Sequence, residues 1–127
     1  MRIALDTNRY TDFGRGETKA VDVLERADTI YVPFVVLAEL RAGFLCGSKN
    51  LENERSLVRF LNSPRVIVAY ADDDTTHQYA RLFAQLRRQG TPIPTNDLWI
   101  AALVVQHDLM LFARDRHFDN LPQIARV

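Results

Sequence analysis

The chain of 127 residues carries 16 basic and 16 acidic residues, so its net charge is zero and a generic basic nucleic-acid binder is not expected. Its length suits a single domain over residues 1–127, and its hydrophobic fraction of 47% is typical of a soluble globular protein. It has neither the run of about 20 apolar residues that a membrane span needs nor a secretory signal, so we expect a cytoplasmic protein that makes no membrane contact.

Apolar patterns predict strands and helices that alternate along the chain. In chain order they are a strand at 2–5, a helix at 17–27, a strand at 29–32, helices at 34–46 and 51–61, a strand at 66–70, helices at 74–89 and 97–107, a strand at 109–113 and a short fifth strand at 124–127. This alternation favours an α/β protein with a mostly parallel sheet of about five strands, covered by helices on both faces.

Three acidic residues stand at the ends of apolar segments. Asp6 follows the first predicted strand, Asp115 follows the strand at 109–113, and Asp97 begins a helix in which every residue from 98 to 105 is apolar. Binding sites of parallel sheets lie at the carboxyl ends of the strands. We therefore expect Asp6 and Asp115 to lie at the same edge of the sheet.

A fourth acid, Glu39, interrupts the apolar helix at 34–46. Its neighbours three and four residues away are all apolar or small, namely Val35, Val36, Ala42 and Gly43. This pattern predicts that Glu39 is shielded from solvent. An unpaired buried carboxylate costs several kcal/mol or takes up a proton, so Glu39 is expected to need a cation.

Each acid also has an ordinary interpretation. Asp6 could cap the following helix, Asp97 could interact with a helix dipole, and Asp115 could be a surface residue. Taken together, the four acids would form an oxygen-rich site for Mg²⁺ or Mn²⁺. Without them the remaining chain has 16 basic and 12 acidic residues, a net charge of +4 that suits a polyanionic substrate.

The segments "ALDTN", "NDLWIAA" and "RDRHF", together with the glutamate of the helix at 34–46, resemble the PIN domain, and specifically the VapC-type ribonuclease toxins. The resemblance extends over essentially the whole chain. It implies a three-layer α/β/α sandwich, cleavage of RNA with tRNA as one candidate substrate, a homodimer, and inhibition by a cognate antitoxin protein. It also implies a catalytic, metal-binding quartet made of Asp6, Glu39, Asp97 and Asp115. Asn8 matches a polar residue that supports the first aspartate.

The chain departs from the family pattern at Ala113, where members often carry Thr or Ser. A hydroxyl group near the metal would then have to come from Thr7 or Thr95. Asp119, four residues after Asp115, is a further candidate for supporting the site.

The resulting hypothesis is an Mg²⁺- or Mn²⁺-dependent endoribonuclease, the toxin of a toxin–antitoxin pair, in which a metal-activated water attacks the phosphodiester. Arg9, Arg114 and Arg116 are next to acids in the sequence and are candidate substrate-binding residues, because guanidinium groups bind phosphate in pairs of hydrogen bonds.

The three histidines show no metal-ligand spacing and are expected to be surface or partly packed residues. Apolar residues surround the helix at 34–46, so either some of them face a subunit or an antitoxin helix, or all are buried against the sheet.

Two other functions stay open. A PIN-fold module that binds RNA or protein without catalysis would keep the fold and lose the activity, although the intact set of four acids argues against it. A receiver-type signalling domain would need an acidic pair after the first strand and a lysine after the last. Here Asp6 is followed by Thr-Asn, and no lysine occurs beyond Lys49.

Overall fold

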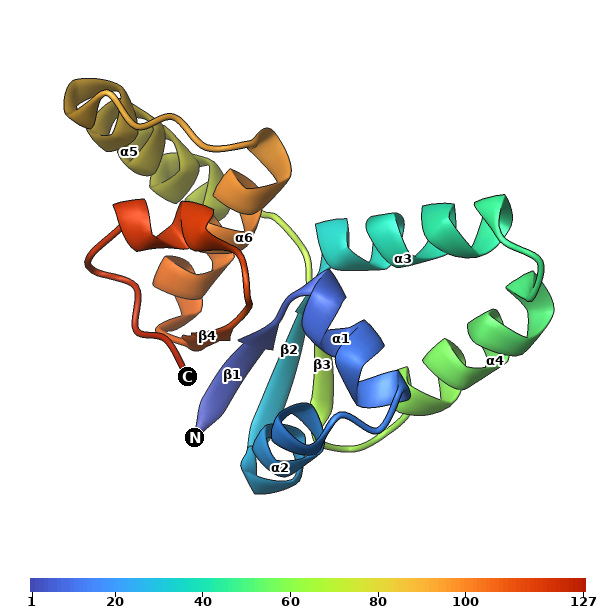
Figure 1. Ribbon diagram of the computed structural model, residues 1–127. Coiled ribbons are helices and arrows are strands. Elements are labelled where there is room, and N and C mark those ends of the chain that lie inside the picture. Colours follow the sequence, from blue (N-terminus) through green and yellow to red (C-terminus); the bar gives the residue numbers. More distant parts are fainter.

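A computed structural model describes residues 1–127 and shows a parallel four-stranded sheet between layers of helices (Figure 1). The strands are β1 (Arg2–Leu5), β2 (Thr29–Pro33), β3 (Val66–Ala69) and β4 (Met110–Phe112), in the order β3-β2-β1-β4. The helices are α1 (Thr7–Gly14), α2 (Thr18–Arg26), α3 (Phe34–Cys46), α4 (Asn50–Leu61), α5 (Asp73–Gln89) and α6 (Thr95–His107), followed by the 3-10 helix η1 (Arg116–Asn120). The predicted three-layer α/β/α class is confirmed.

The predicted fifth strand at 124–127 is wrong. After η1 the chain pairs with β4 only in an isolated parallel bridge between Leu111 and Arg126. Two backbone hydrogen bonds flank it, from Leu111 N–H to the Ala125 carbonyl (2.8 Å) and from Val127 N–H to the Leu111 carbonyl (3.0 Å). The segment passes along β4 for too few residues to extend the sheet.

Like the short η1, helix α1 was not predicted from the sequence. It is mostly polar, and only Tyr10 and Phe13 recur at helical spacing on it. Both aromatic rings pack against Phe60 of α4, with ring centroids 5.3 and 5.8 Å away. These few tertiary contacts and the cap that Asp6 provides stabilise a helix whose apolar pattern is weak.

Side chains of the central strands alternate between two cores, as the pleat of a strand requires. Ile3 and Leu5 of β1 point to the core that contains α2, whereas Ala4 between them belongs to the larger core that contains α6. The helices on both faces therefore bury Ile3, Ala4 and Leu5 completely, and only Arg2 at the start of β1 is exposed. Its carboxyl end, where the chain turns into α1, opens toward the start of α3 and α6 (Figure 1).

Helix α6 is the buried helix predicted from its apolar run. Leu98 and the residues from 100 to 104 are buried. Trp99 is half-buried and packs on Tyr79 of α5, with ring centroids 4.4 Å apart.

No helix is both long enough and apolar enough to cross a membrane.

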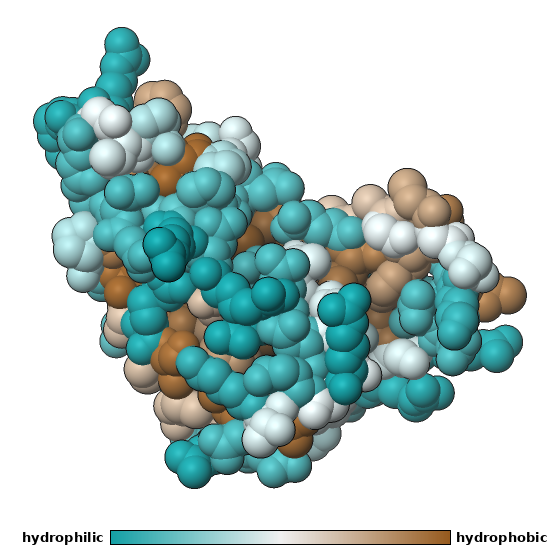
Figure 2. All heavy atoms as spheres, in the orientation of Figure 1, coloured by the Kyte–Doolittle hydropathy of each residue, from teal (hydrophilic) through white to brown (hydrophobic).

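Helix α3 is buried only in part. Val35, Val36, Leu37 and Leu40 are buried, whereas Leu45 at its far end is 73% exposed. Hydrophobic residues gather on the outer part of α3 in the space-filling view (Figure 2). Of the two alternatives for this helix, complete burial against the sheet is therefore excluded.

A buried threonine connects α5 to α6. Thr75 is fully buried, its hydroxyl oxygen accepts a hydrogen bond from Asp72 N–H (2.9 Å), and the hydroxyl donates to Gln106 of α6. Asp72 accepts from Thr75 N–H in return, which completes the capping box of α5. This network holds the helix that presents Asp97 against its neighbour.

Thr75→Val keeps the shape of this side chain but removes its hydrogen bonds. We expect the free energy of unfolding to fall by about 1–3 kcal/mol, the cost of leaving buried polar groups unpaired. Urea unfolding measures this value, with Thr76→Val on the exposed side of the same helix as the matched control. Equal unfolding midpoints for the two variants would contradict the role assigned to Thr75.

Candidate active site

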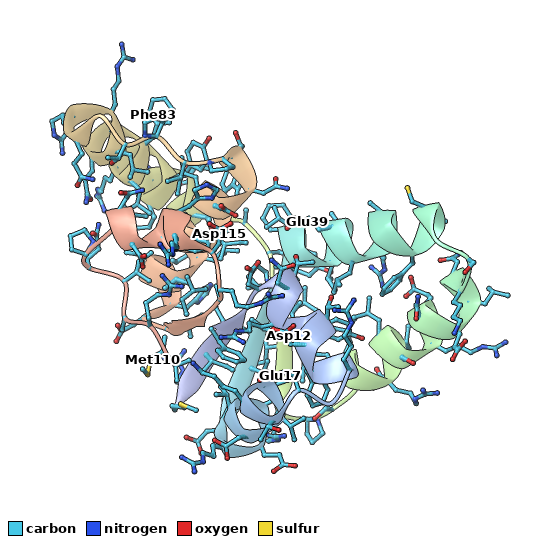
Figure 3. The ribbon with its side chains drawn as sticks, viewed as in Figure 1. Asp12, Glu17, Glu39, Phe83, Met110 and Asp115 are labelled. Carbon is cyan, nitrogen blue, oxygen red and sulfur yellow. The ribbon has the colours of Figure 1, made fainter.

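The four acids of the predicted quartet come from four elements that meet where β1 and β4 end. Asp6 directly follows β1, Asp115 lies three residues beyond β4, Glu39 lies on α3, and Asp97 lies in the first turn of α6. Figure 3 shows Glu39 and Asp115 near the point where the chain leaves β1 for α1. The negative charges of Asp97, Glu39 and Asp115 all act on Asp6.

Asp6 is the most buried of the four, with 7% of the residue exposed. Its Oδ1 accepts a hydrogen bond from Thr7 N–H (2.7 Å) and so caps α1. Burial raises the pKa of Asp6 from 3.8 to about 6, against the effect of the Thr7 hydrogen bond and with help from the three neighbouring acids. Asp6 is thus both a helix cap and a member of the acid cluster, and Oδ2 remains available for another ligand.

Glu39 is exposed, so the prediction that it is shielded from solvent is wrong. Its neighbours Ala42 and Gly43 are exposed as well. These small residues line an open side of α3 instead of the core, which sequence alone could not distinguish. The Thr7 hydroxyl donates to Glu39 Oε1 (3.2 Å). Partial desolvation of the carboxylate raises the pKa of Glu39, and the charge of Asp97 adds to this effect.

Asp97 and Asp115 are joined by a histidine that the sequence pattern did not identify. The Nδ1 atom of His117 lies 2.8 Å from Asp97 Oδ2 and 2.9 Å from Asp115 Oδ1. Desolvation raises the pKa of Asp97, although its hydrogen bond with His117 opposes the change. The same hydrogen bond raises the pKa of His117. The only signal in the sequence was the spacing of two residues between Asp115 and His117.

Asp12, a second residue that the sequence pattern did not identify, binds two arginines. Asp12 is buried, and it binds Arg114 Nε (3.0 Å) and Arg9 Nη1 (3.3 Å). The guanidinium group of Arg9 also stacks on the Phe112 ring, 4.5 Å from its centroid. These contacts connect α1 to β4 and to the segment after it. They therefore hold Asp6, which precedes α1, near Asp115, which follows β4.

The other predicted residues lie around the cluster. Asn8 is exposed in the first turn of α1, and Arg116 is exposed at the start of η1. Asp119 forms an ion pair with Arg126 (2.9 Å) and is not placed against the four acids. Of the predicted arginines, Arg114 keeps half of its side chain exposed, whereas only 12% of the Arg9 side chain is exposed.

The hydroxyl expected near the site comes from Thr7, through its contact with Glu39. Thr95 is exposed at the first position of α6. Ala113 is buried, and its carbonyl accepts a hydrogen bond from Arg126 Nη2 (2.7 Å). A larger side chain at position 113 would therefore have to fit into packed core.

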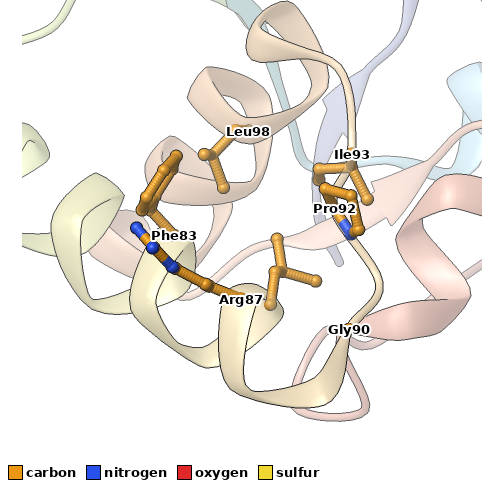
Figure 4. Close-up of a pocket in the computed structure, with 7 residues that line it drawn as sticks. Phe83, Arg87, Gly90, Pro92, Ile93 and Leu98 are labelled. Atoms are coloured by element: carbon orange, nitrogen blue, oxygen red, sulfur yellow. The ribbon is translucent and has the colours of Figure 1, made fainter.

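None of the four grooves on the protein is lined by Asp6, Glu39, Asp97 or Asp115. One apolar groove of about 310 Å³ lies between the end of α5 and the start of α6, with Leu98, the residue after Asp97, in its wall (Figure 4). Of the four acids only Glu39 is exposed, Asp97 and Asp115 are half-buried, and Asp6 is buried, so the cluster is reached from the side of Glu39 and the start of α6. A site of this kind can approach the backbone of a large substrate.

Comparison with known proteins identifies the family. A family model described as the PIN domain matches residues 3–124. Ribonuclease VapC5 of Mycobacterium tuberculosis is 31% identical over 125 residues, which cover 97% of this chain and 90% of that protein. Ribonuclease VapC1 of Haemophilus influenzae strain R2866 is 33% identical over 94 residues, which cover 68% of this chain and 69% of that protein.

Solved structures agree with this assignment. VapBC2 from Rickettsia felis, bound to a DNA fragment from its promoter, matches with a TM-score of 0.87 and 26% identity, over 100% of this chain and 98% of that chain. VapBC-1 from nontypeable Haemophilus influenzae has the same fold, with a TM-score of 0.87 and 23% identity, over 100% of this chain and 97% of that chain. As the sequence resemblance predicted, the chain belongs to the PIN-domain family and is similar to its VapC members.

Proposed function

We propose that the chain is a divalent-metal-dependent endoribonuclease and the toxin of a toxin–antitoxin pair. The observation that carries this proposal is the convergence of three carboxylates, those of Glu39, Asp97 and Asp115, on the buried Asp6, whose pKa rises to about 6. Such a cluster is unfavourable without a counter-charge, since like charges disfavour ionisation of one another. The names of the relatives, which are ribonucleases, supply the reaction class.

The donor set fits Mg²⁺ or Mn²⁺. Both ions bind carboxylate oxygens, and Mg²⁺ uses few protein ligands and keeps several waters. Asp6, Glu39 and Asp97 would hold the principal cation, and Asp115 would complete the site or hold a second ion. A cation bound there would lower the pKa of a water molecule and neutralise charge on the phosphate.

The chain's own residues position the acids and the substrate. The cap of α1 fixes Asp6, Thr7 orients Glu39, and the start of α6 places a positive dipole end beside Asp97. Arg114 and Arg116 are proposed to bind phosphates next to the acids. Arg9, which binds Asp12 and stacks on Phe112, supports the fold at this point instead.

The proposed partners are RNA and a cognate antitoxin. The similar structures from Rickettsia felis and Haemophilus influenzae are of VapBC proteins. A groove of about 290 Å³ between α1, α3 and α4 has a mixed lining, with Tyr10, Leu40 and Phe44 beside polar residues, and is proposed to receive an antitoxin helix. A homodimer, which the sequence resemblance implies, belongs to the same proposal.

A binding module without catalysis is the second candidate. It would retain the groove between α1, α3 and α4 and the arginines but would have no use for four clustered carboxylates. The cost of holding Asp6 buried among like charges favours the catalytic function over this alternative.

Asp97→Asn is expected to abolish metal-dependent RNA cleavage while leaving the fold intact. The purified protein is incubated with several RNAs, including tRNA, and Mn²⁺ or Mg²⁺, with and without chelator. Asp73→Asn, which changes an exposed acid in the first turn of α5, is the matched control and should cleave like the unchanged protein. Equal cleavage by Asp97→Asn and the control would reject the proposed site.

The ends of the cleaved RNA report the attacking group. Water is the expected nucleophile, because a bound cation would activate it and no nucleophilic side chain is then required. The products should then carry a 5′-phosphate and a 3′-hydroxyl, which end labelling and mass spectrometry distinguish. A 2′,3′-cyclic phosphate would show that the ribose hydroxyl attacks instead.

Asp6→Asn should stabilise the metal-free protein. The pKa of Asp6 is 3.8 ordinarily and about 6 in the folded chain, so ionising it costs folding stability as the pH rises through this range. The difference corresponds to about 3 kcal/mol at pH 8 and shrinks toward pH 4. Asn keeps an N-cap acceptor for Thr7 N–H, so the cap is preserved.

The measurement is the free energy of unfolding in urea with chelator at pH 4, 6 and 8. Addition of Mn²⁺ should then raise the stability of the unchanged protein more than that of the variant. An Asp6→Asn protein that is no more stable than the parent at pH 8 would contradict the repulsion argument.

A further inference from the structure

His117 occupies a place among the acids that the family resemblance did not assign. Three residues, Asp97, Asp115 and His117, each offer one possible ligand atom, and these three atoms lie within 4.8 Å of one another. The Nδ1 atom is within hydrogen-bond distance of a carboxylate oxygen of both acids, at 2.8 and 2.9 Å. Ligands about 2.1 Å from an octahedral ion and at right angles to one another lie about 3.0 Å apart, so these separations suit neighbouring ligands of one ion.

The backbone around His117 holds the ring in this position. His117 N–H donates to Asp115 Oδ1 (2.9 Å), so the acid caps η1 and turns the chain back toward itself. The next residue, Phe118, is 1% exposed and anchors η1 in the core. Arg126 Nη2 donates to the Asp115 carbonyl (3.2 Å) and closes the other side of the turn. The imidazole is therefore directed at Asp97 by a fixed turn.

We propose that His117 Nδ1 is a ligand of the cation held by Asp97 and Asp115, and that it makes the site prefer Mn²⁺ to Mg²⁺. This inference rests on the proposed function, because it requires that the acids bind a divalent cation. Mg²⁺ favours oxygen ligands, whereas an imidazole nitrogen suits transition metals. A site built only from carboxylates would lack this source of selectivity.

A positioning role for His117 would give different results from a ligand role. A histidine that only orients the two acids would support Mn²⁺ and Mg²⁺ equally, and its nitrogen would not be bonded to the ion. A ligand gives a nitrogen coupling in the pulsed electron paramagnetic resonance spectrum of bound Mn²⁺. With a ligand role, replacing His117 also changes the ratio of the Mn²⁺ affinity to the Mg²⁺ affinity.

The test uses the full chain with MnCl₂ or MgCl₂, by isothermal titration calorimetry and by pulsed electron paramagnetic resonance. His117→Gln removes the imidazole, and His77→Gln, at an exposed histidine of α5 that pairs with Asp73, is the matched control. We expect a nitrogen coupling in the unchanged protein and in His77→Gln, and its loss in His117→Gln. Mn²⁺ affinity should fall at least about tenfold in His117→Gln, with a much smaller change for Mg²⁺.

Three outcomes would overturn the inference. Bound Mn²⁺ without a nitrogen coupling in the unchanged protein would show that His117 is not a ligand, and this result needs no variant. Equal weakening of both ions in His117→Gln would assign it a positioning role. Failure of the unchanged protein to bind either ion, with no difference from Asp97→Asn, would remove the proposed metal site itself and this inference with it.

Discussion

Repulsion among four carboxylates at one edge of the sheet is the constraint on which the rest of the site depends. Asp6 is buried beside three other acids, and its pKa rises to about 6 as a result of burial first and of their charges second. The surrounding fold has to hold the acids in place against this repulsion, and a bound cation would relieve it. The fold meets the first requirement, and the proposed divalent metal is that cation.

Backbone amides hold two of the acids directly. Asp6 caps α1 and Asp115 caps η1, each accepting an N–H from the turn that follows it, while Asp97 lies in the first turn of α6. Each acid thereby gains a favourable interaction with the amino end of a helix. The ion pair between Asp12 and Arg114 connects α1 to the chain after β4. These contacts bring acids from separate segments of the sequence to one edge of the sheet.

The sequence predicted most of the fold and left out what depends on tertiary contacts. Buried elements with long apolar runs, such as α6, were predicted well because their periodicity and composition agree. Helix α1 was not predicted, since it depends on the packing of Tyr10 and Phe13 against a distant helix. Burial of Glu39 was predicted wrongly, because small neighbours indicate a close-packed face and an open site edge equally well.

The candidate site shows the same division. The family resemblance named four acids, and the structure places them at one edge. Asp12 and His117 could not be identified from spacing, because their roles arise from contacts across elements. His117 joins Asp97 to Asp115 only because η1 folds back, and no periodic pattern in "RDRHF" signals that turn.

The most direct test of the central claim is a crystal structure of the chain grown with MnCl₂, with anomalous diffraction used to locate the ion. The account predicts an anomalous peak bounded by carboxylate oxygens of Asp6, Glu39 and Asp97, at the carboxyl end of β1. A well-ordered set of four acids with no such peak, or with the ion bound away from all four acids, would contradict it.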